Sequence, residues 1–233
     1  MYNLIGQAVV GASELYGSCL GSDNLRFVRL GEEPEYEQLQ QLFENADGIR
    51  LPLSYLKQGR AFLCKNKSGE VQGGFAFIDN GPYRSLEQIP MKMVNLSEQE
   101  LTEITGVCLS SGNGLRRLRF WSFMIGQALS SPSNEFIYAV DSTKLSLREK
   151  IFNHIRLETL YEGVVKQLEG MSETSTEAVE LTTKAQLFTG FGKLAYREGM
   201  VLFNETVAQR KQLLSSTFKK PMRLVKKLSF QLR

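Results

Sequence analysis

The stretch LTEITGVCLSSGNGLRRLRFWSFMIGQAL (residues 101–129) decides the fold of this chain. An apolar, strand-like run ends at residues 110–114, Ser-Ser-Gly-Asn-Gly, and the sequence restarts as a basic amphipathic helix. A glycine-flanked turn before a helix presents unpaired backbone N–H groups and the positive end of the macrodipole, so it can hold an anion such as a pyrophosphate. Arg116 and Arg117 fall in the first helical turn, where they oppose the macrodipole unless an anionic ligand binds. The alternative is an ordinary strand-to-helix connection in which glycine only makes the turn.

Length and composition predict a globular protein with one large domain, with or without an appendage. The chain has 233 residues, of which 42% are hydrophobic, enough to bury a substantial core. No run approaches the roughly 18 apolar residues of a membrane span, and the first residues lack the basic start of a signal peptide, so we expect a cytoplasmic protein. Three cysteines without a CxxC pair and a single histidine support neither a disulfide framework nor a metal site. Cys64 and Cys108 lie in apolar runs, which favours buried structural thiols.

Charge is distributed unevenly along the chain, although the net charge is only +3. No acidic residue follows Glu205, and basic residues alternate with apolar ones across residues 210–233. Such an amphipathic segment can lie on an anionic membrane surface, which predicts peripheral membrane association of a cytoplasmic protein. A solvated tail, or a helix packed on its own domain, would have the same composition. Nucleic acid is disfavoured as a partner, because the rest of the chain has no basic stripe or aromatic platform.

Hydrophobic periodicity predicts alternating strands and helices. The expected strands cover residues 24–30, 61–66, 71–78, 100–109, 135–140, 157–168 and 176–181. The expected helices cover residues 34–46, 53–57, 115–129 and 144–155, and the pattern is helical again from about residue 184. This order predicts an α/β (α+β) fold with a mixed, partly parallel sheet of about seven strands. We expect a domain over residues 1–183 and a C-terminal helical extension with a basic amphipathic tail over residues 184–233.

Written in order, the elements β-α-α-β-β-β-α-β-α-β-β resemble the GNAT superfamily of acyl-CoA-dependent N-acyltransferases over residues 24–181. The resemblance implies a sheet that splays at its centre and direct transfer of an acyl group, without a metal, from acyl-CoA or acyl carrier protein to an amine. In that superfamily a Q/R-x-x-G-x-G/A loop at a helix N-terminus grips the donor pyrophosphate. Here Leu109 occupies the first position, with Gly112 and Gly114 as the glycines, so Arg116 or Arg117 has to replace the expected Gln or Arg.

The resemblance also implies roles for individual residues. Glu103, in the strand before the loop, is the candidate base that deprotonates the amine, and the alternative is a strand-edge carboxylate facing solvent. Tyr138, His154 and Tyr161 are available as the acid for the leaving thiolate; we take His154 as the candidate, with a capping or packing role as its alternative. Residues expected to contact the donor are Val107, Leu109, Gly112, Asn113, Gly114, Leu115, Arg116, Arg117, Ser142 and Thr143. Ser142 and Thr143 could instead cap the following helix.

Two features favour a long acyl chain and an acidic donor. The helical run over residues 187–214 is rich in Phe, Leu and Met and could cover such a chain. GNAT-like autoinducer synthases and long-chain N-acyl amino acid synthases use acyl carrier protein, which is acidic, and a basic rim of Arg116, Arg117, Arg119 and the tail would attract it. The competing hypothesis is a GNAT-like protein without catalysis that binds a membrane or a protein partner. The departure at Leu109 favours this second hypothesis.

Overall fold

The computed structural model describes residues 25–87, 89, 101–110, 114–142, 157–164, 168, 176–193, 196, 197 and 200. The chain divides into two compact units, Met1–Leu194 and Ala195–Arg233. The secondary structure that follows belongs to the first unit. No helix in the described part of the chain is long and apolar enough to cross a membrane.

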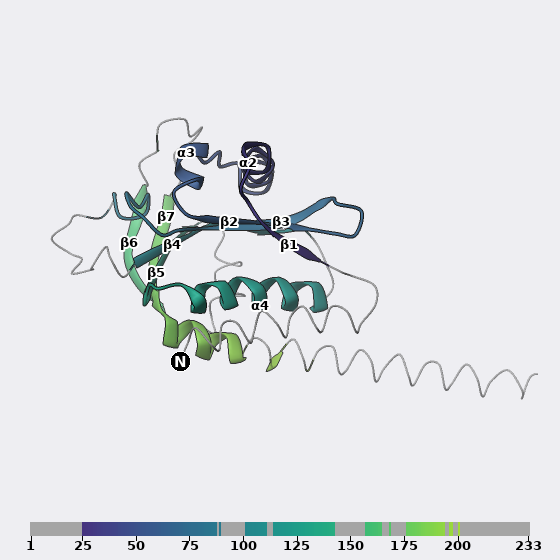
Figure 1. Cartoon of the computed structure of the whole chain (residues 1–233). Coiled ribbons are helices and arrows are strands. Elements are labelled where there is room, and N and C mark those ends of the chain that lie inside the picture. The colour runs from purple at the N-terminus through teal and green to yellow at the C-terminus, as the bar shows by residue number, and fades with distance from the viewer. Residues whose placement is uncertain are drawn as a thin grey trace, which may run out of the picture. The chain divides into compact units, whose positions relative to one another are not determined.

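A seven-stranded sheet forms the centre of the first unit, in the order β1-β2-β3-β4-β5-β7-β6 (Figure 1). Its strands are β1 (Arg26–Arg29), β2 (Arg60–Lys65), β3 (Val71–Ile78), β4 (Leu101–Leu109), β5 (Glu135–Asp141), β6 (Glu158–Val164) and β7 (Thr176–Thr183). Neighbouring strands are antiparallel except β4 and β5, which run parallel. The predicted mixed sheet of about seven strands is confirmed.

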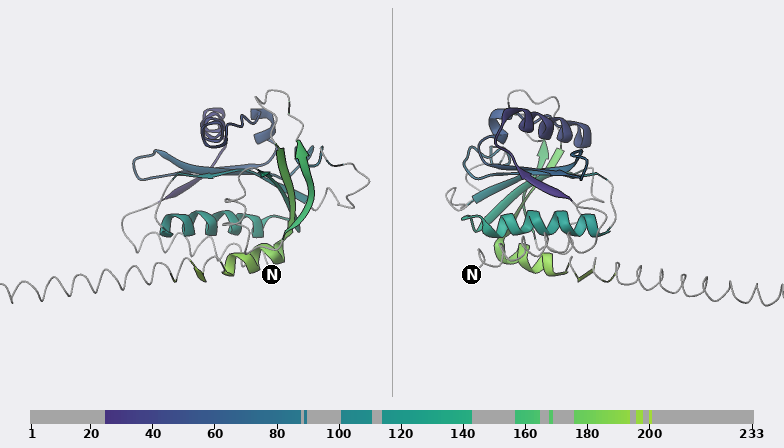
Figure 2. Two further views of the ribbon diagram at one scale, coloured as in Figure 1. Left: turned by 180° about the vertical axis from the view of Figure 1, so that it is seen from behind. Right: turned by 45° about the vertical axis from the view of Figure 1, so that its right-hand side comes forward.

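Helices cover both faces of this sheet (Figures 1 and 2). α2 (Glu33–Asp47) and α3 (Leu53–Leu56) lie on one face, and α4 (Gly114–Ser130) lies on the other. α2 begins with Pro34 in its first turn and ends at Gly48, whose φ of 75° suits the left-handed C-cap. A further helix over residues 184–193 lies on the α4 side and contributes Leu187 to the core there.

Each face has its own core, because successive side chains of a strand point to opposite faces. On the α4 face, aromatic rings of β2, β3 and α4 contact one another with centroids 5.1 to 6.2 Å apart. These rings belong to Phe62, Phe75, Phe120 and Phe123. On the α2 face, aliphatic side chains predominate, among them Leu39, Leu56, Leu63 and Ile78. The two cores hold the sheet between its helical layers and fix which face each strand residue meets.

β4 and β5 separate after a short parallel ladder. The ladder pairs Leu101 with Glu135, Thr102 with Phe136 and Glu103 with Ile137, and no later pair joins the two strands among the described residues. Beyond it, β4 stays paired only with β3, and β5 stays paired with β7 to its end. β4 changes from buried to half-buried at Gly106, and β5 does so at Ala139. The sheet therefore splays at its centre, as the resemblance implies.

A bulge at Gly106 bends β4 beyond this ladder. The register with β3 shifts between Thr105 and Cys108, so that β4 carries one extra residue. Gly106 has a φ of 59°, and a Cβ there would lie 2.1 Å from Cε2 of Phe43 on α2. Glycine is required at this position both for the backbone conformation and for the close approach of Phe43. Because a bulge increases local twist, it directs β4 away from the straight path that pairing with β5 would need.

Candidate functional site

Glu103 lies at the vertex of the splay, in the last ladder pair with Ile137. Its side chain is 0% exposed, so the alternative of a solvent-facing carboxylate is wrong. The Ser85 hydroxyl donates to Oε1 at 2.8 Å, and the Ser85 N–H donates to Oε2 at 3.3 Å. The hydroxyl of Tyr55, on α3, also hydrogen-bonds to this carboxylate. These donors place the Glu103 carboxylate on the α2 face of the sheet.

Burial changes the protonation of this site. Desolvation raises the pKa of Glu103, and the Arg84 guanidinium and the hydrogen bonds from Tyr55 and Ser85 counter it only in part. Desolvation, with the nearby Glu103 carboxylate, also raises the pKa of Tyr55, so Tyr55 stays a neutral hydrogen-bond donor. A general base works best when its pKa lies near the working pH, and a raised pKa brings a carboxylate closer to neutral pH.

An ion pair lies beside Glu103. Arg84 donates from its two terminal nitrogens to the two carboxylate oxygens of Glu177, at 3.0 and 2.8 Å. The backbone N–H of Arg84 donates to the Tyr55 hydroxyl at 3.2 Å. Desolvation opposes the charge on Arg84, but Glu177 and the weaker attraction of Glu103 outweigh it, and the pKa of Arg84 is raised. We call Tyr55, Arg84, Ser85, Glu103 and Glu177 the Glu103 cluster.

Sequence reasoning identified Glu103 and missed the other four members of this cluster. Tyr55 comes from α3, Arg84 and Ser85 from the loop between β3 and β4, and Glu177 from β7. A buried Tyr, Arg or Glu outside a motif has no signal in one sequence.

The structure describes some of the predicted donor-binding residues, which lie in β4, at the start of α4 and just after β5. Val107 and Leu109 are half-buried and pack against the α4-face core, and Gly114 begins α4. The Ser142 hydroxyl donates to the Thr176 carbonyl at 3.0 Å, linking the end of β5 to the start of β7. Gly112, Asn113, Thr143 and His154, and the side chain of Leu115, lie outside the described residues. Their roles stay predictions.

Gln72 of β3 hydrogen-bonds to residues on both sides of the predicted anion-binding loop. Its backbone carbonyl accepts the Ser110 N–H at 2.7 Å. Its side-chain Oε1 accepts from the Ser110 hydroxyl at 3.3 Å and from Arg116 at 3.0 Å. Residues 111–113 lie between these two anchors in sequence. Sequence reasoning missed Gln72, because only the register of β3 against β4 brings it to the loop.

The structure also places the arginines of the predicted basic rim and the two tyrosines considered as general acids. Arg117 is exposed, but Arg119 is 6% exposed and donates to the Leu25 carbonyl at 3.0 Å. The prediction of Arg119 in a basic rim is therefore wrong, because the helical spacing turns it toward the sheet. Of the alternative acids, Tyr138 is buried in the core on the α4 face, opposite Glu103, and Tyr161 donates to the Val164 carbonyl at 3.3 Å.

The described residues contain no group of three or more His, Cys, Asp or Glu side chains that could hold a metal. Cys64 is a buried free thiol, as expected, and burial raises its pKa to about 12. Cys108 is only half-buried, because it follows the bulge in the diverging part of β4. The Cys64 thiol therefore lacks the properties of a reactive thiolate.

No family model and no curated protein matches this sequence. Solved structures do match its fold. FeeM, an N-acyl amino acid synthase from uncultured soil microbes, aligns with a TM-score of 0.52 at 12% identity, over 71% of this chain and 94% of that protein. The AHL synthase LasI aligns with a TM-score of 0.51 at 10% identity, over 73% of this chain and 94% of that protein. The fold is thus GNAT-like and similar to that of autoinducer synthases, as the order of elements predicts.

Proposed function

We propose that this protein is an N-acyltransferase that transfers an acyl group from a thioester donor, acyl-CoA or acyl carrier protein, to an amine. The observation that carries the proposal is the position of Glu103, a buried carboxylate at the vertex of a split parallel strand pair. The likeness of the fold to an N-acyl amino acid synthase and an AHL synthase supports this reaction class.

The split between β4 and β5 suits an extended donor. Beyond Glu103 and Ile137 the facing strand edges have no ladder pair within the described ranges, and backbone N–H and C=O groups need partners. The amide groups of a pantetheine arm would supply them. Residues 110–116, braced by Gln72, would hold its phosphate at the α4 N-terminus, and half-buried Val107 and Leu109 would contact its apolar parts.

In the proposed reaction the amine nitrogen attacks the thioester carbonyl carbon. A C–N bond forms, the C–S bond breaks and the thiolate leaves, for which His154 remains the proposed proton source. The amine proton would go to Glu103. Because that carboxylate is fully buried, a water molecule would carry the amine proton to it. Backbone N–H groups of β4 beyond the ladder would polarise the carbonyl.

Ligand-dependent unfolding and thiol release test this proposal. CoA, long-chain acyl-CoA or acyl carrier protein should raise the Tm, because a ligand that binds only the native state stabilises it. Thiol release from acyl-CoA and from acyl carrier protein should then depend on an added amine. Absence of both effects would reject the enzyme in favour of a binding protein without catalysis.

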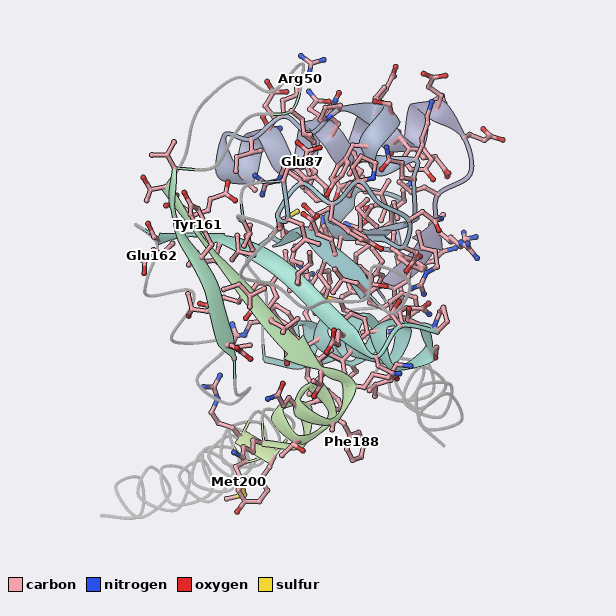
Figure 3. All side chains as sticks on the ribbon, turned by 90° about the vertical axis from the view of Figure 1, so that its left-hand side faces the viewer. Arg50, Glu87, Tyr161, Glu162, Phe188 and Met200 are labelled. Atoms are coloured by element: carbon pink, nitrogen blue, oxygen red, sulfur yellow. The ribbon has the colours of Figure 1, made fainter. Side chains whose placement is uncertain are left out.

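Glu103→Gln assigns the base. It should lower turnover while the donor-induced Tm shift stays close to that of the wild type. Glu162→Gln is the matched control, because Glu162 is an exposed carboxylate on β6, the edge strand that β5 and β7 separate from the split (Figure 3). Equal turnover of the two variants would remove Glu103 as the base.

Association of residues 210–233 with an anionic membrane is a separate proposal. Co-sedimentation with phosphatidylserine vesicles compares the full chain with a chain that ends at Leu214. Retained association of the shorter chain would reject a membrane role for this tail.

A further inference from the structure

The loop between β3 and β4 bridges the split in the sheet on the α2 face. Ser85 of this loop binds Glu103 on β4, and the preceding residue, Arg84, binds Glu177 on β7. β4 belongs to the half of the sheet formed by β1 to β4, and β7 lies beyond β5 in the other half. Two adjacent loop residues therefore hold opposite halves of a sheet whose β4–β5 ladder has three pairs.

Glu177 lies toward the open end of the split. It pairs with Asp141, the last residue of β5, whereas Leu181 pairs with Ile137 at the vertex. At 3.3 Å per residue, Glu177 is about 13 Å farther along β7 than the vertex. Arg84 thus reaches over the region where β4 and β5 have already diverged. Glu87, in the same loop, lies on the α2 side of the sheet (Figure 3).

The ion pair is buried and well aligned. Arg84 is 5% exposed and Glu177 is 1% exposed, and the guanidinium meets both carboxylate oxygens. A desolvated pair of this kind is costly unless its geometry is good, and breaking one partner leaves a lone buried charge. Tyr55, Ser85 and Arg84 are the groups that act on Glu103 from α3 and the loop. Arg84 is therefore bonded to one carboxylate and attracts a second.

We infer that Arg84 is a positioning residue: held by Glu177, it keeps the loop over the split, Ser85 on Glu103, and a positive charge beside that carboxylate. The inference rests on the proposed function, because Glu103 is the base only in that reaction. Arg84 itself does not touch the reacting atoms. Its effect on acyl transfer passes through Glu103.

Replacing the whole pair separates this role from a structural one. Arg84→Met combined with Glu177→Leu removes both charges and leaves no lone buried ion, a change that is often nearly neutral for stability. Without the nearby cation, the acid limb of the pH profile of kcat/KM should move up by about one pH unit or more. Turnover at neutral pH should fall, while the KM for the donor changes little.

Glu177→Gln should act in the opposite direction. It releases the guanidinium from its carboxylate and leaves it to interact with Glu103, so the acid limb should move to lower pH. A general loss of structure would not move the limb in opposite directions in the two variants. This single variant also keeps the inference testable if the double variant does not fold.

Asp79→Asn is the matched control. Asp79 also accepts two hydrogen bonds from one arginine, Arg60, at 2.7 and 2.9 Å, in a more exposed pair, and is the first residue of the same loop. Within the described part of the chain, the hydrogen-bond partners of Glu103 are Ser85 and Tyr55, and Asp79 is not among them. The control should lower stability and leave the acid limb where it is in the wild type.

Unfolding measured at several pH values detects the same shift in the pKa of Glu103 without an activity assay. The free energy of unfolding of the wild type and of each variant is measured with and without Glu103→Gln. The pH at which Glu103 alters this free energy should shift in the same direction as the acid limb. No shift in either variant, or shifts equal to that of Asp79→Asn, would overturn the inference. Shifts in unfolding without acyl transfer by any form would reject the proposed function and leave the control of Glu103 by Arg84 supported.

Discussion

Glu103 of β4 and Ile137 of β5 form the last pair of the parallel ladder, and their strands diverge from that pair onward. Both side chains are fully buried, and one of them is a carboxylate. The position at which pairing ends is therefore also the position at which a titratable group lies inside the protein. The split between β4 and β5 therefore begins at the residue that carries the titratable group.

Glu103→Gln should change how stability depends on pH. Burial raises the pKa of Glu103 in the folded state, so the folded protein binds this proton more tightly than the unfolded chain. The resulting stabilisation is fully present below the unfolded value of about 4.5 and is lost as pH rises through the raised folded pKa. The stability of the wild type relative to the variant should therefore fall as pH rises. Urea unfolding at several pH values measures it, and a difference that grows with pH would contradict it.

Gly106→Ala should be more destabilising than Gly48→Ala. Both glycines have positive φ, 59° and 75°, which costs an L-residue about 1–2 kcal/mol. A Cβ at Gly48 meets no atom within 4 Å, whereas at Gly106 it meets the Phe43 ring at 2.1 Å. We expect about 1 kcal/mol for Gly48→Ala and about 3 kcal/mol for Gly106→Ala, since overpacking adds to the backbone cost. Equal losses in urea unfolding would show that the Phe43 contact is unimportant.

Gln72→Ala should weaken donor binding if residues 110–116 hold a phosphate. Loss of the side-chain acceptor removes one hydrogen bond from the Ser110 hydroxyl and one from Arg116, so binding must order these groups further, at a cost of about 1 kcal/mol or about fivefold in Kd. Gln72→Glu keeps an acceptor but adds a negative charge, so its binding should weaken most at low salt and recover as salt rises. Calorimetric titration with CoA measures both. Unchanged affinity in both variants would place the phosphate elsewhere.

Lys184→Met should alter stability in the alkaline range. The Lys184 ammonium donates to the Ser131 carbonyl at 2.6 Å, just after the C-terminal end of α4. Burial lowers the pKa of Lys184, so the folded protein binds this proton less tightly than the unfolded chain. The free energy of unfolding of the wild type, relative to that of the variant, should rise as the pH increases from the lowered pKa of Lys184 in the folded state to about 10.5, its value in the unfolded chain. Lys193→Met, at an exposed lysine of the same helix, controls for the loss of one positive charge. A difference that falls with pH would contradict the prediction.

Much of the fold could be predicted because the relevant patterns are local. The helix expected over residues 34–46 is α2 (Glu33–Asp47), and the strand expected over residues 100–109 is β4 (Leu101–Leu109). The strand expected over residues 176–181 is two residues longer in the structure, since β7 ends at Thr183. Hydrophobic periodicity identifies an element well but its end poorly, because the last residues depend on what they pair with.

The candidate site was less predictable. Glu103 could be identified by its place before the loop, but its burial could not, because strand alternation leaves either face open until the helices are placed. Arg119 shows the converse error, since a basic residue among arginines looks exposed in sequence and is buried against the sheet.

The sequence by itself determined most of the described strands and helices and their order, because these depend on side-chain periodicity and backbone freedom. The tertiary structure decided where β4 and β5 part and which groups surround Glu103. Tyr55, Ser85, Arg84 and Glu177 come from three separate elements, and only packing of the loop and α3 against the sheet brings them together. Burial, and with it the raised pKa of Glu103, is a property of that packing and of no single segment.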